Sequence, residues 1–318
     1  MKPWLFSRRM DLLVFGGTAA IALLLVALAP WIGAPGKDAP RWTWITGVLL
    51  VDVAHVWSTV FVVYLDPIER ARRPFFYRVV PLACFAFGVV VFMLGGLPLF
   101  WRCIAYLAVF HFVRQQYGWV MMYRARAGER AYRWLDTATI YATTIYPLLV
   151  WHAAPPRDFQ WMREGDFVIG LPPIVATIAG YAYVALLAAY VARAIVVRNW
   201  GKHLVVGTTA ACWYVGIVAT NSDYAFTVTN VFIHGIPYMA LVYIYARNAG
   251  SRLLARGPWI FLGTLWLIAY VEELGWGHAG GDWEWIVAPL LATPQLAHYV
   301  LDGFLWSKKR NPRIAQLL

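Results

Sequence analysis

Four histidines in this sequence lie deep inside long apolar runs, and each has an acidic or amide residue three or four positions away. The pairs are Asp52 with His55, His111 with Gln115, Asn230 with His234, and His298 with Asp302. On a helix, residues at this spacing share one face, so each imidazole and its companion would point the same way. Ionisable and polar groups at such depth in a bilayer are costly and therefore suggest a functional site.

The chemistry that fits these residues is metal binding, because neutral imidazole suits iron, copper and zinc. The predicted metal ligands are His55, His111, His234 and His298. A metal-bound histidine usually donates its other ring N–H to a carboxylate, a carbonyl or a water molecule. The residues predicted to orient these rings, or to complete the coordination, are Asp52, Gln115, Asn230 and Asp302. One of two neighbouring glutamates, Glu272 or Glu273, could face the same cavity.

Arg114 follows His111 by three residues and would share its helix face. We predict that its guanidinium pairs with Asp52, Asp302 or a glutamate, or meets an anionic head group of the substrate. The predicted catalytic set is Asp52, Arg114, Gln115 and Asp302. Three nearby tyrosines are instead assigned to packing or to the membrane interface, and they are Tyr117, Tyr238 and Tyr299. The alternative for any single histidine is a hydrogen bond to a neighbouring helix.

The composition indicates which elements position these residues. Of the 318 residues, 61% are hydrophobic and only 14% are charged, whereas soluble domains carry about 25% charged residues. We therefore expect an all-α fold, a polytopic transmembrane helix bundle, with residues 1–318 forming one integral membrane domain. The basic residues and apolar run at the N-terminus are interpreted as a retained first span rather than a cleaved signal peptide.

A helix that spans the bilayer needs about 20 apolar residues, and the sequence contains ten such runs. They lie at about 11–31, 42–65, 77–95, 98–123, 133–153, 171–193, 203–220, 224–246, 257–276 and 285–306. With the N-terminus in the cytoplasm, the segments on the inside hold 21 Lys and Arg residues and those outside hold 4. This asymmetry predicts ten spans with both termini in the cytoplasm. It also accounts for the net charge of +11 without a nucleic-acid partner.

The four histidines fall on the second, fourth, eighth and tenth predicted spans, which all run in the same direction. Counted from the outer ends, they lie about 14, 14, 11 and 14 residues into their spans. At about 1.5 Å per residue, this places them within roughly 5 Å of one another in depth. Metal sites in helix bundles are built from side chains on facing helices. One metal held by all four histidines is therefore the prediction.

The segments around these histidines resemble those of a bacterial polytopic membrane protein family. The segments are His55-Val-Trp57, His111-Phe-Val-Arg-Gln-Gln-Tyr-Gly118, His234-Gly-Ile-Pro237 and His298-Tyr-Val-Leu-Asp-Gly303. This resemblance implies the bacterial inner membrane but no activity. In kind, a buried four-histidine site is similar to the Brp/Blh-type carotene dioxygenases and to the membrane fatty-acid desaturases and hydroxylases, which implies iron. The HxxxH and HxxHH boxes of the desaturases and the paired histidines of the carotene enzymes are missing, so neither substrate is carried over.

The function that these patterns favour is a non-haem iron oxygenase, desaturase or hydroxylase that acts on a lipidic substrate from the bilayer, with zinc or copper as other metals. Three alternatives remain open. The first is a haem protein with histidines as axial ligands. The second is a transporter with a buried histidine relay. The third is a zinc hydrolase, which would need one open coordination position and a path for water.

Overall fold

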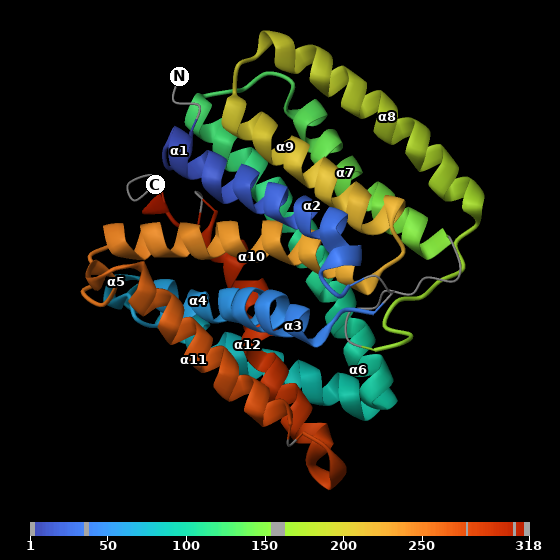
Figure 1. Ribbon diagram of the computed structural model, residues 1–318. Coiled ribbons are helices and arrows are strands. Elements are labelled where there is room, and N and C mark those ends of the chain that lie inside the picture. Colours follow the sequence, from blue (N-terminus) through green and yellow to red (C-terminus); the bar gives the residue numbers. More distant parts are fainter. Residues whose placement is uncertain (1–3, 35–37, 154–162, 278, 308–309, 315–318) are drawn as a thin grey trace. The chain divides into compact units, whose positions relative to one another are not determined.

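The computed structural model describes residues 4–34, 38–153, 163–277, 279–307 and 310–314 (Figure 1). Helices make up the regular structure, and no strand occurs among these residues, which confirms the all-α prediction. The contacts within the chain divide it into two compact units, and the integral membrane domain of residues 1–318 stays a prediction. Unit 1 comprises Met1–Trp44, Val109–Trp161 and Phe167–His234, and unit 2 comprises Ile45–Ala108, Met162–Asp166 and Gly235–Leu318.

Unit 1 contains the N-terminal helical segment and the middle of the chain. Its complete elements are α1 (Arg8–Asp11), η1 (Leu12–Gly17), α2 (Thr18–Leu28), η2 (Ala29–Trp31), α3 (Arg41–Thr43), α7 (Arg133–Ala153), α8 (Pro173–Val196), α9 (Trp200–Trp213) and η4 (Tyr214–Ala219). Helix α7 packs against α8 and α9, and η1 and α2 also lie along α9. Aromatic side chains fill the spaces; the rings of Phe15 and Trp119, for example, meet edge to face at 5.1 Å. Such a pair contributes about 0.5–1.5 kcal/mol beyond its buried area.

A cluster of buried charges joins four helix ends within unit 1. We call it the charge cluster, and it consists of Arg124, Glu129, Asp136, Arg193 and Lys202. Asp136 Oδ1 accepts from Arg193 at 2.8 Å, its Oδ2 lies 3.0 Å from Lys202 Nζ, and the carboxylate also accepts from Arg124. Both Asp136 and Lys202 are completely buried. The cluster therefore fixes the ends of α6, α7, α8 and α9 to one another.

Unit 2 is built around α4. Its complete elements are α4 (Ala54–Val63), α5 (Pro67–Arg72), η5 (Leu254–Arg256), α11 (Pro258–Trp276), η6 (Gly281–Trp283) and α12 (Glu284–Leu305), and it also holds most of η3 (Trp44–Val53). Helix α4 packs against α11 and α12. The backbones approach closely where Gly235 meets Val51, since a Cβ on Gly235 would lie 2.7 Å from Val51 Cγ1 and 3.1 Å from its carbonyl oxygen. Glycine at position 235 therefore permits the contact.

Two long helices, α6 (Pro74–Ala127) and α10 (Asp223–Asn248), pass from one unit to the other. Helix α6 has 54 residues and is interrupted at Gly95 and Gly96, where the backbone leaves the helical conformation. An unbroken helix of that length would measure about 81 Å, more than twice the roughly 30 Å of a bilayer's hydrocarbon core. The break coincides with the predicted boundary between the spans at 77–95 and 98–123.

Five of the described helices are long and apolar enough to cross a membrane. They are Arg8–Trp31, Arg41–Val63, Pro74–Ala127, Pro173–Val196 and Asp223–Asn248. The other predicted spans also coincide with helices, namely α7, α9 with η4, α11 and α12. These are interrupted or carry more polar residues, such as Asp136 in α7 and Glu272 in α11. The structure thus supports a membrane protein but gives five such helices where the sequence predicted ten spans.

Candidate functional site

In unit 2, helix packing brings together two of the predicted ligands, His55 on α4 and His298 on α12. Their ring centroids lie 4.9 Å apart, and the rings meet edge to face at 82°. Each histidine is only 1% exposed. Because α4 and α12 are neighbours, residues separated by more than 240 positions form one buried imidazole pair.

The ring of His298 is held by a residue that sequence reasoning missed. Thr59, one turn after His55 on α4, places its Oγ1 2.7 Å from His298 Nδ1. Asp302 was predicted to hold this ring, but its Oδ1 lies 3.7 Å from Nδ1, which is longer than a hydrogen bond. Asp302 instead accepts hydrogen bonds from the Tyr238 hydroxyl at 2.5 Å and from Trp306 Nε1 at 3.3 Å. Asp302 is therefore connected to the histidines through Tyr238 rather than by a hydrogen bond to a ring.

Tyr238, which the sequence assigned to packing, lies at the centre of this cluster. Its ring meets His298 at 5.0 Å and His55 at 5.7 Å between centroids. Its hydroxyl is 3.4 Å from Thr59 Oγ1, in addition to its bond with Asp302. The only signal in the sequence was its position four residues after His234, on the same helical face. We call this group the histidine cluster; it combines the imidazoles of His55 and His298 with the phenol of Tyr238, the hydroxyl of Thr59 and the carboxylate of Asp302.

Asp52 lies near His55, with 3.5 Å between Asp52 Oδ1 and His55 Nδ1, but makes no hydrogen bond to the ring. It lies near the end of η3, a π-helical segment, and such wide turns are frequent at functional sites. Asp52 Oδ1 is buried and accepts no hydrogen bond from the described residues.

Glu272 is held differently, because its carboxylate accepts from Trp57 Nε1 at 2.6 Å and from Trp276 Nε1 at 3.4 Å. Two indoles, rather than a histidine, therefore fix Glu272.

Unit 1 contains the second imidazole pair, formed by His111 on α6 and His234 on α10. The ring centroids lie 5.1 Å apart at an angle of 86°, and both residues are buried. Phe112 stacks on the His234 ring with its centroid 3.6 Å away and the planes 19° apart. This stacking fixes the plane of the imidazole while leaving ligation within that plane possible.

Gln115 and Asn230 are the two amides predicted beside this pair, and each forms a hydrogen bond through its side-chain nitrogen. The Nε2 of Gln115 donates to the backbone carbonyl of His234 at 2.8 Å. Gln115 therefore contacts the backbone of His234 rather than its ring. Asn230 donates to the Phe226 carbonyl at 3.1 Å. The side-chain oxygens of Gln115 and Asn230 are buried and accept no hydrogen bond in the part of the chain that the structure describes.

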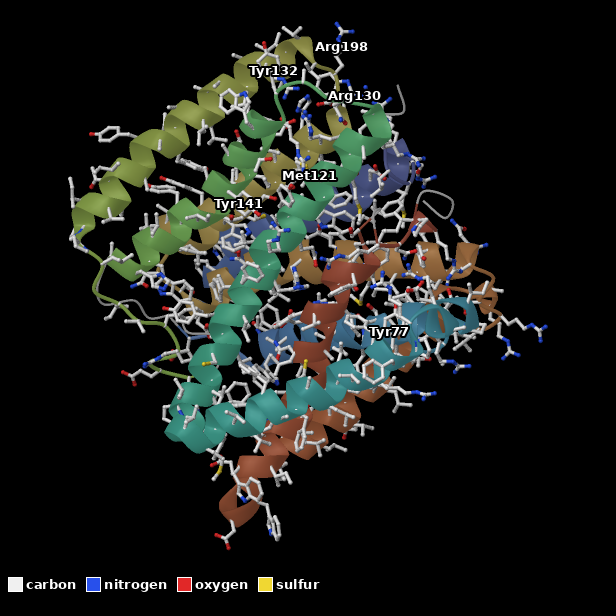
Figure 2. The ribbon with its side chains drawn as sticks, turned by 180° about the vertical axis from the view of Figure 1, so that it is seen from behind. Tyr77, Met121, Arg130, Tyr132, Tyr141 and Arg198 are labelled. Atoms are coloured by element: carbon white, nitrogen blue, oxygen red, sulfur yellow. The ribbon has the colours of Figure 1, made fainter. Side chains whose placement is uncertain are left out.

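The structure gives Arg114 a different partner from the predicted carboxylates, while its predicted role toward a substrate stays a prediction. Its side chain is exposed, its guanidinium donates to the Tyr141 hydroxyl, and it lies over the Tyr117 ring at 4.8 Å. Tyr141 is among the side chains labelled in Figure 2. Among the described residues its hydrogen-bond partner is thus a phenol rather than a carboxylate. His111 is buried whereas Arg114, three residues later, is exposed, and the neighbouring tyrosine rings attract the cation.

The donor groups in both units are of the types that a transition metal takes, namely imidazole nitrogens and side-chain oxygens. Each unit also contains buried oxygens that accept no hydrogen bond among the described residues, those of Asp52 in unit 2 and of Gln115 and Asn230 in unit 1. Leaving such an oxygen unsatisfied costs about 1–3 kcal/mol. A cation, or water bound to it, would offset that cost, so the residues fit a metal.

Comparison with known proteins adds no assignment. No family model matches this chain, and no curated protein or solved structure shows significant similarity to it.

Proposed function

We propose that this chain is a membrane-embedded metalloenzyme whose metal, with iron preferred, is held by His55, His111, His234 and His298. The observation that supports this most directly is that each unit contains a buried pair of imidazoles with ring centroids about 5 Å apart, 4.9 Å in one and 5.1 Å in the other. The proposal that one metal uses both pairs rests on the sequence, in which the four histidines lie within roughly 5 Å of one another in predicted depth.

The reaction class that we propose is a non-haem iron oxygenation, desaturation or hydroxylation of a lipidic substrate. Bound iron with imidazole ligands and open positions supplies oxygen chemistry. The chain's own residues would hold and orient the ligands. Thr59 keeps the Nδ1 of His298 engaged at 2.7 Å, and Asp302 fixes the Tyr238 hydroxyl beside both rings of its unit. Long apolar helices around these residues suit a hydrophobic substrate that arrives from the bilayer.

Elemental analysis of the purified protein, combined with an optical spectrum, tests this function. We expect near-stoichiometric iron without a Soret band, and loss of metal in both His298→Ala and His111→Ala, one variant from each unit. His152→Ala is the matched control, because that ring bonds to the Leu148 carbonyl within α7. Loss in one variant alone would restrict the site to a single pair. Unchanged metal in both variants, or a protein without metal, would refute the proposal and favour the transporter alternative.

We also propose that the chain lies in the bacterial inner membrane with both termini in the cytoplasm, because 21 of the loop Lys and Arg residues fall on one predicted side and 4 on the other. Cysteine labelling in a background without Cys84, Cys103 and Cys212 tests this. Arg130→Cys, at an exposed position labelled in Figure 2, should be protected from a reagent outside the cell. Asp38→Cys, also exposed, should react. The reverse pattern would invert the topology.

A further inference from the structure

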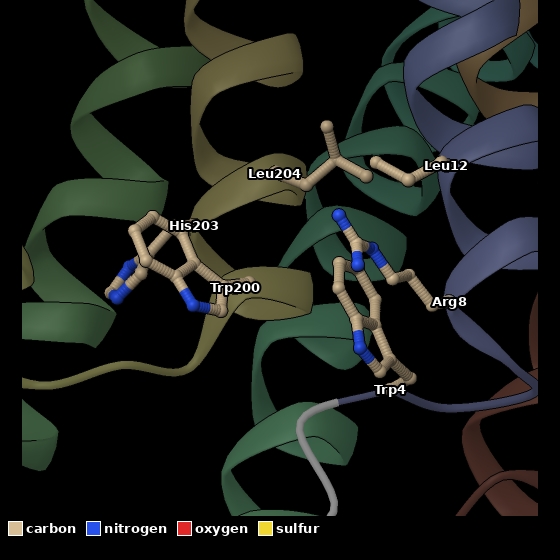
Figure 3. A pocket seen from close by; sticks show the side chains of 6 residues that line it. All are labelled: Trp4, Arg8, Leu12, Trp200, His203 and Leu204. Atoms are coloured by element: carbon tan, nitrogen blue, oxygen red, sulfur yellow. The ribbon is translucent and has the colours of Figure 1, made fainter.

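An open pocket of about 510 Å³ lies in unit 1, formed by the N-terminal segment and α9. The residues that line it are Trp4, Arg8, Leu12, Trp200, His203 and Leu204. Figure 3 shows Trp4 and Arg8 on one side of the opening and Trp200 with His203 on the other. None of these residues belongs to the imidazole pairs, so the pocket is separate from the proposed metal centre.

Arg8 supplies the available charge of this pocket. Its side chain is exposed and has no hydrogen bond or ion pair with the described residues. The neighbouring cation on α9, Lys202, is committed to the charge cluster through Glu129 at 2.6 Å. His203 has both ring nitrogens occupied, Nδ1 by the Tyr190 hydroxyl at 2.8 Å and Nε2 by the Val197 carbonyl at 2.6 Å. An anion that enters the pocket would therefore meet the guanidinium of Arg8.

The N-terminal wall of the pocket is built rather than loosely placed. Arg126 donates its Nε to the carbonyl of Trp4 at 3.0 Å. The carboxylate of Asp11 accepts the backbone N–H of Leu5 at 2.6 Å and that of Phe6 at 3.0 Å. The same carboxylate accepts the Tyr123 hydroxyl at 2.6 Å. The segment that carries Trp4 is thus fastened to α6 and held beside Arg8.

From this geometry we propose that the pocket binds an anionic phospholipid, with its phosphate at Arg8 and one acyl chain along Leu12 and Leu204. Guanidinium groups match phosphate oxygens in shape and charge. Indoles such as Trp4 and Trp200 favour the level of the lipid head groups. Leu12 and Leu204 form the apolar part of the pocket. Leu12 belongs to the first apolar helix, where it and Leu13 are exposed. Inorganic phosphate would satisfy only the guanidinium, so the apolar wall favours the lipid.

Native mass spectrometry of the full chain in detergent, titrated with phosphatidylglycerol or phosphatidylcholine of identical acyl chains, tests this site. We expect one preferentially retained phosphatidylglycerol and about five- to tenfold weaker binding in Arg8→Gln, as removal of one cation near a lipid surface predicts. Arg9→Gln is the matched control, because Arg9 is an equally exposed neighbour that does not line the pocket. Its affinity should stay within about twofold.

Three results would overturn the proposal. Equal losses in the Arg8 and Arg9 variants would mean that only the general surface charge matters. Equal retention of the two lipids would exclude recognition of the anionic group. Displacement of the lipid by inorganic phosphate at matched concentration would assign the site to a free anion. A second variant, Trp200→Ala, alters an exposed side chain and should also weaken binding, with an unchanged unfolding temperature as evidence that it folds.

Discussion

The charge cluster of unit 1 and the histidine cluster of unit 2 are both buried polar groups, yet they are satisfied in opposite ways. In the charge cluster, each carboxylate meets cationic side chains, as when Asp136 contacts Arg124, Arg193 and Lys202. In the histidine cluster, Asp302 accepts from a phenol and an indole, and Asp52 lies beside an imidazole. The first cluster pairs both of its carboxylates with cations of the chain, whereas the second offers electron-pair donors to a cation.

This difference separates a structural role from a chemical one. Burying an ion pair costs several kcal/mol of desolvation per ion, which close and numerous partners offset. The charge cluster meets that requirement with the chain's own residues, and its cations already occupy the carboxylates that could otherwise bind a metal. Imidazoles dominate the histidine cluster, and imidazole is a ligand type that transition metals take. A bound metal is therefore expected to matter for one cluster and not for the other.

The largest effect should come from Asp136→Asn. This change removes one of the two negative charges from among three cations, two of which are buried, and breaking a buried pair in this way costs about 3–5 kcal/mol. Denaturant unfolding in detergent should show that loss, while the metal content per folded protein stays unchanged. Asp282→Asn, at an exposed position, is the control and should be neutral. A stable Asp136→Asn protein would show that the charge cluster does not hold the helix ends.

A smaller effect, seen in metal binding rather than in folding, is expected for Asp302→Asn. The amide keeps an acceptor for Tyr238 but cannot supply a carboxylate, so metal retention should fall about 10–100-fold, as for other groups that orient metal ligands. Equilibrium dialysis against a chelator measures this retention. Tyr238→Phe should shift it in the same direction, since it removes the hydroxyl bonded to Asp302. Wild-type retention in both variants would dissociate these residues from metal binding.

The pH dependence of stability should report on the charge cluster through Glu129. Burial opposes the charge of Glu129, but hydrogen bonds from Lys202 and Asn199 and the charges of Lys202 and Arg124 outweigh it and lower its pKa. The stabilisation is therefore complete above the ordinary pKa of 4.5 and is lost as the pH falls through the lower folded value. Unfolding temperatures measured below pH 5 should drop less steeply in Glu129→Gln than in the wild type. Parallel curves would contradict this assignment.

The smallest effect is expected for Arg114→Gln. The side chain is exposed and bonded to Tyr141, and an exposed polar contact contributes about 1 kcal/mol or less. Metal content and activity should therefore match the wild type, unlike those of the histidine variants. Loss of activity with full metal retention would return Arg114 to the substrate-binding role that the sequence first suggested.

The positions of the helices were largely predictable, because apolar runs mark the helices and Pro or Gly residues mark many of their ends. The predicted range 133–153 coincides with α7, and 257–276 differs from α11 by one residue at its start. The π-helical segments were not predictable. One of them, η3, contains Asp52, and hydrophobic periodicity does not distinguish a wide turn from a regular one.

The histidines that pair in each unit were predictable from the sequence, but their supporting contacts were not. Histidines stand out because polar residues are rare inside apolar spans. Their partners Thr59 and Tyr238 do not stand out, because hydroxyl groups are common in membrane helices and their roles depend on which helices pack together. The partner of Arg114 was also not predictable. Its spacing from His111 suggested a carboxylate, whereas nearby tyrosines contact its guanidinium.

The break in α6 has a consequence for how this sequence can vary. Gly96 has φ +64° and ψ −164°, a region of backbone space that is essentially restricted to glycine. Every single-nucleotide change that replaces this glycine introduces a side chain there. By contrast, a Cβ on Gly207 or Gly263 would meet nothing within 4 Å. Natural variants should therefore accumulate at those two positions and be purged at Gly96, where one achiral residue lets a single long helix turn into two.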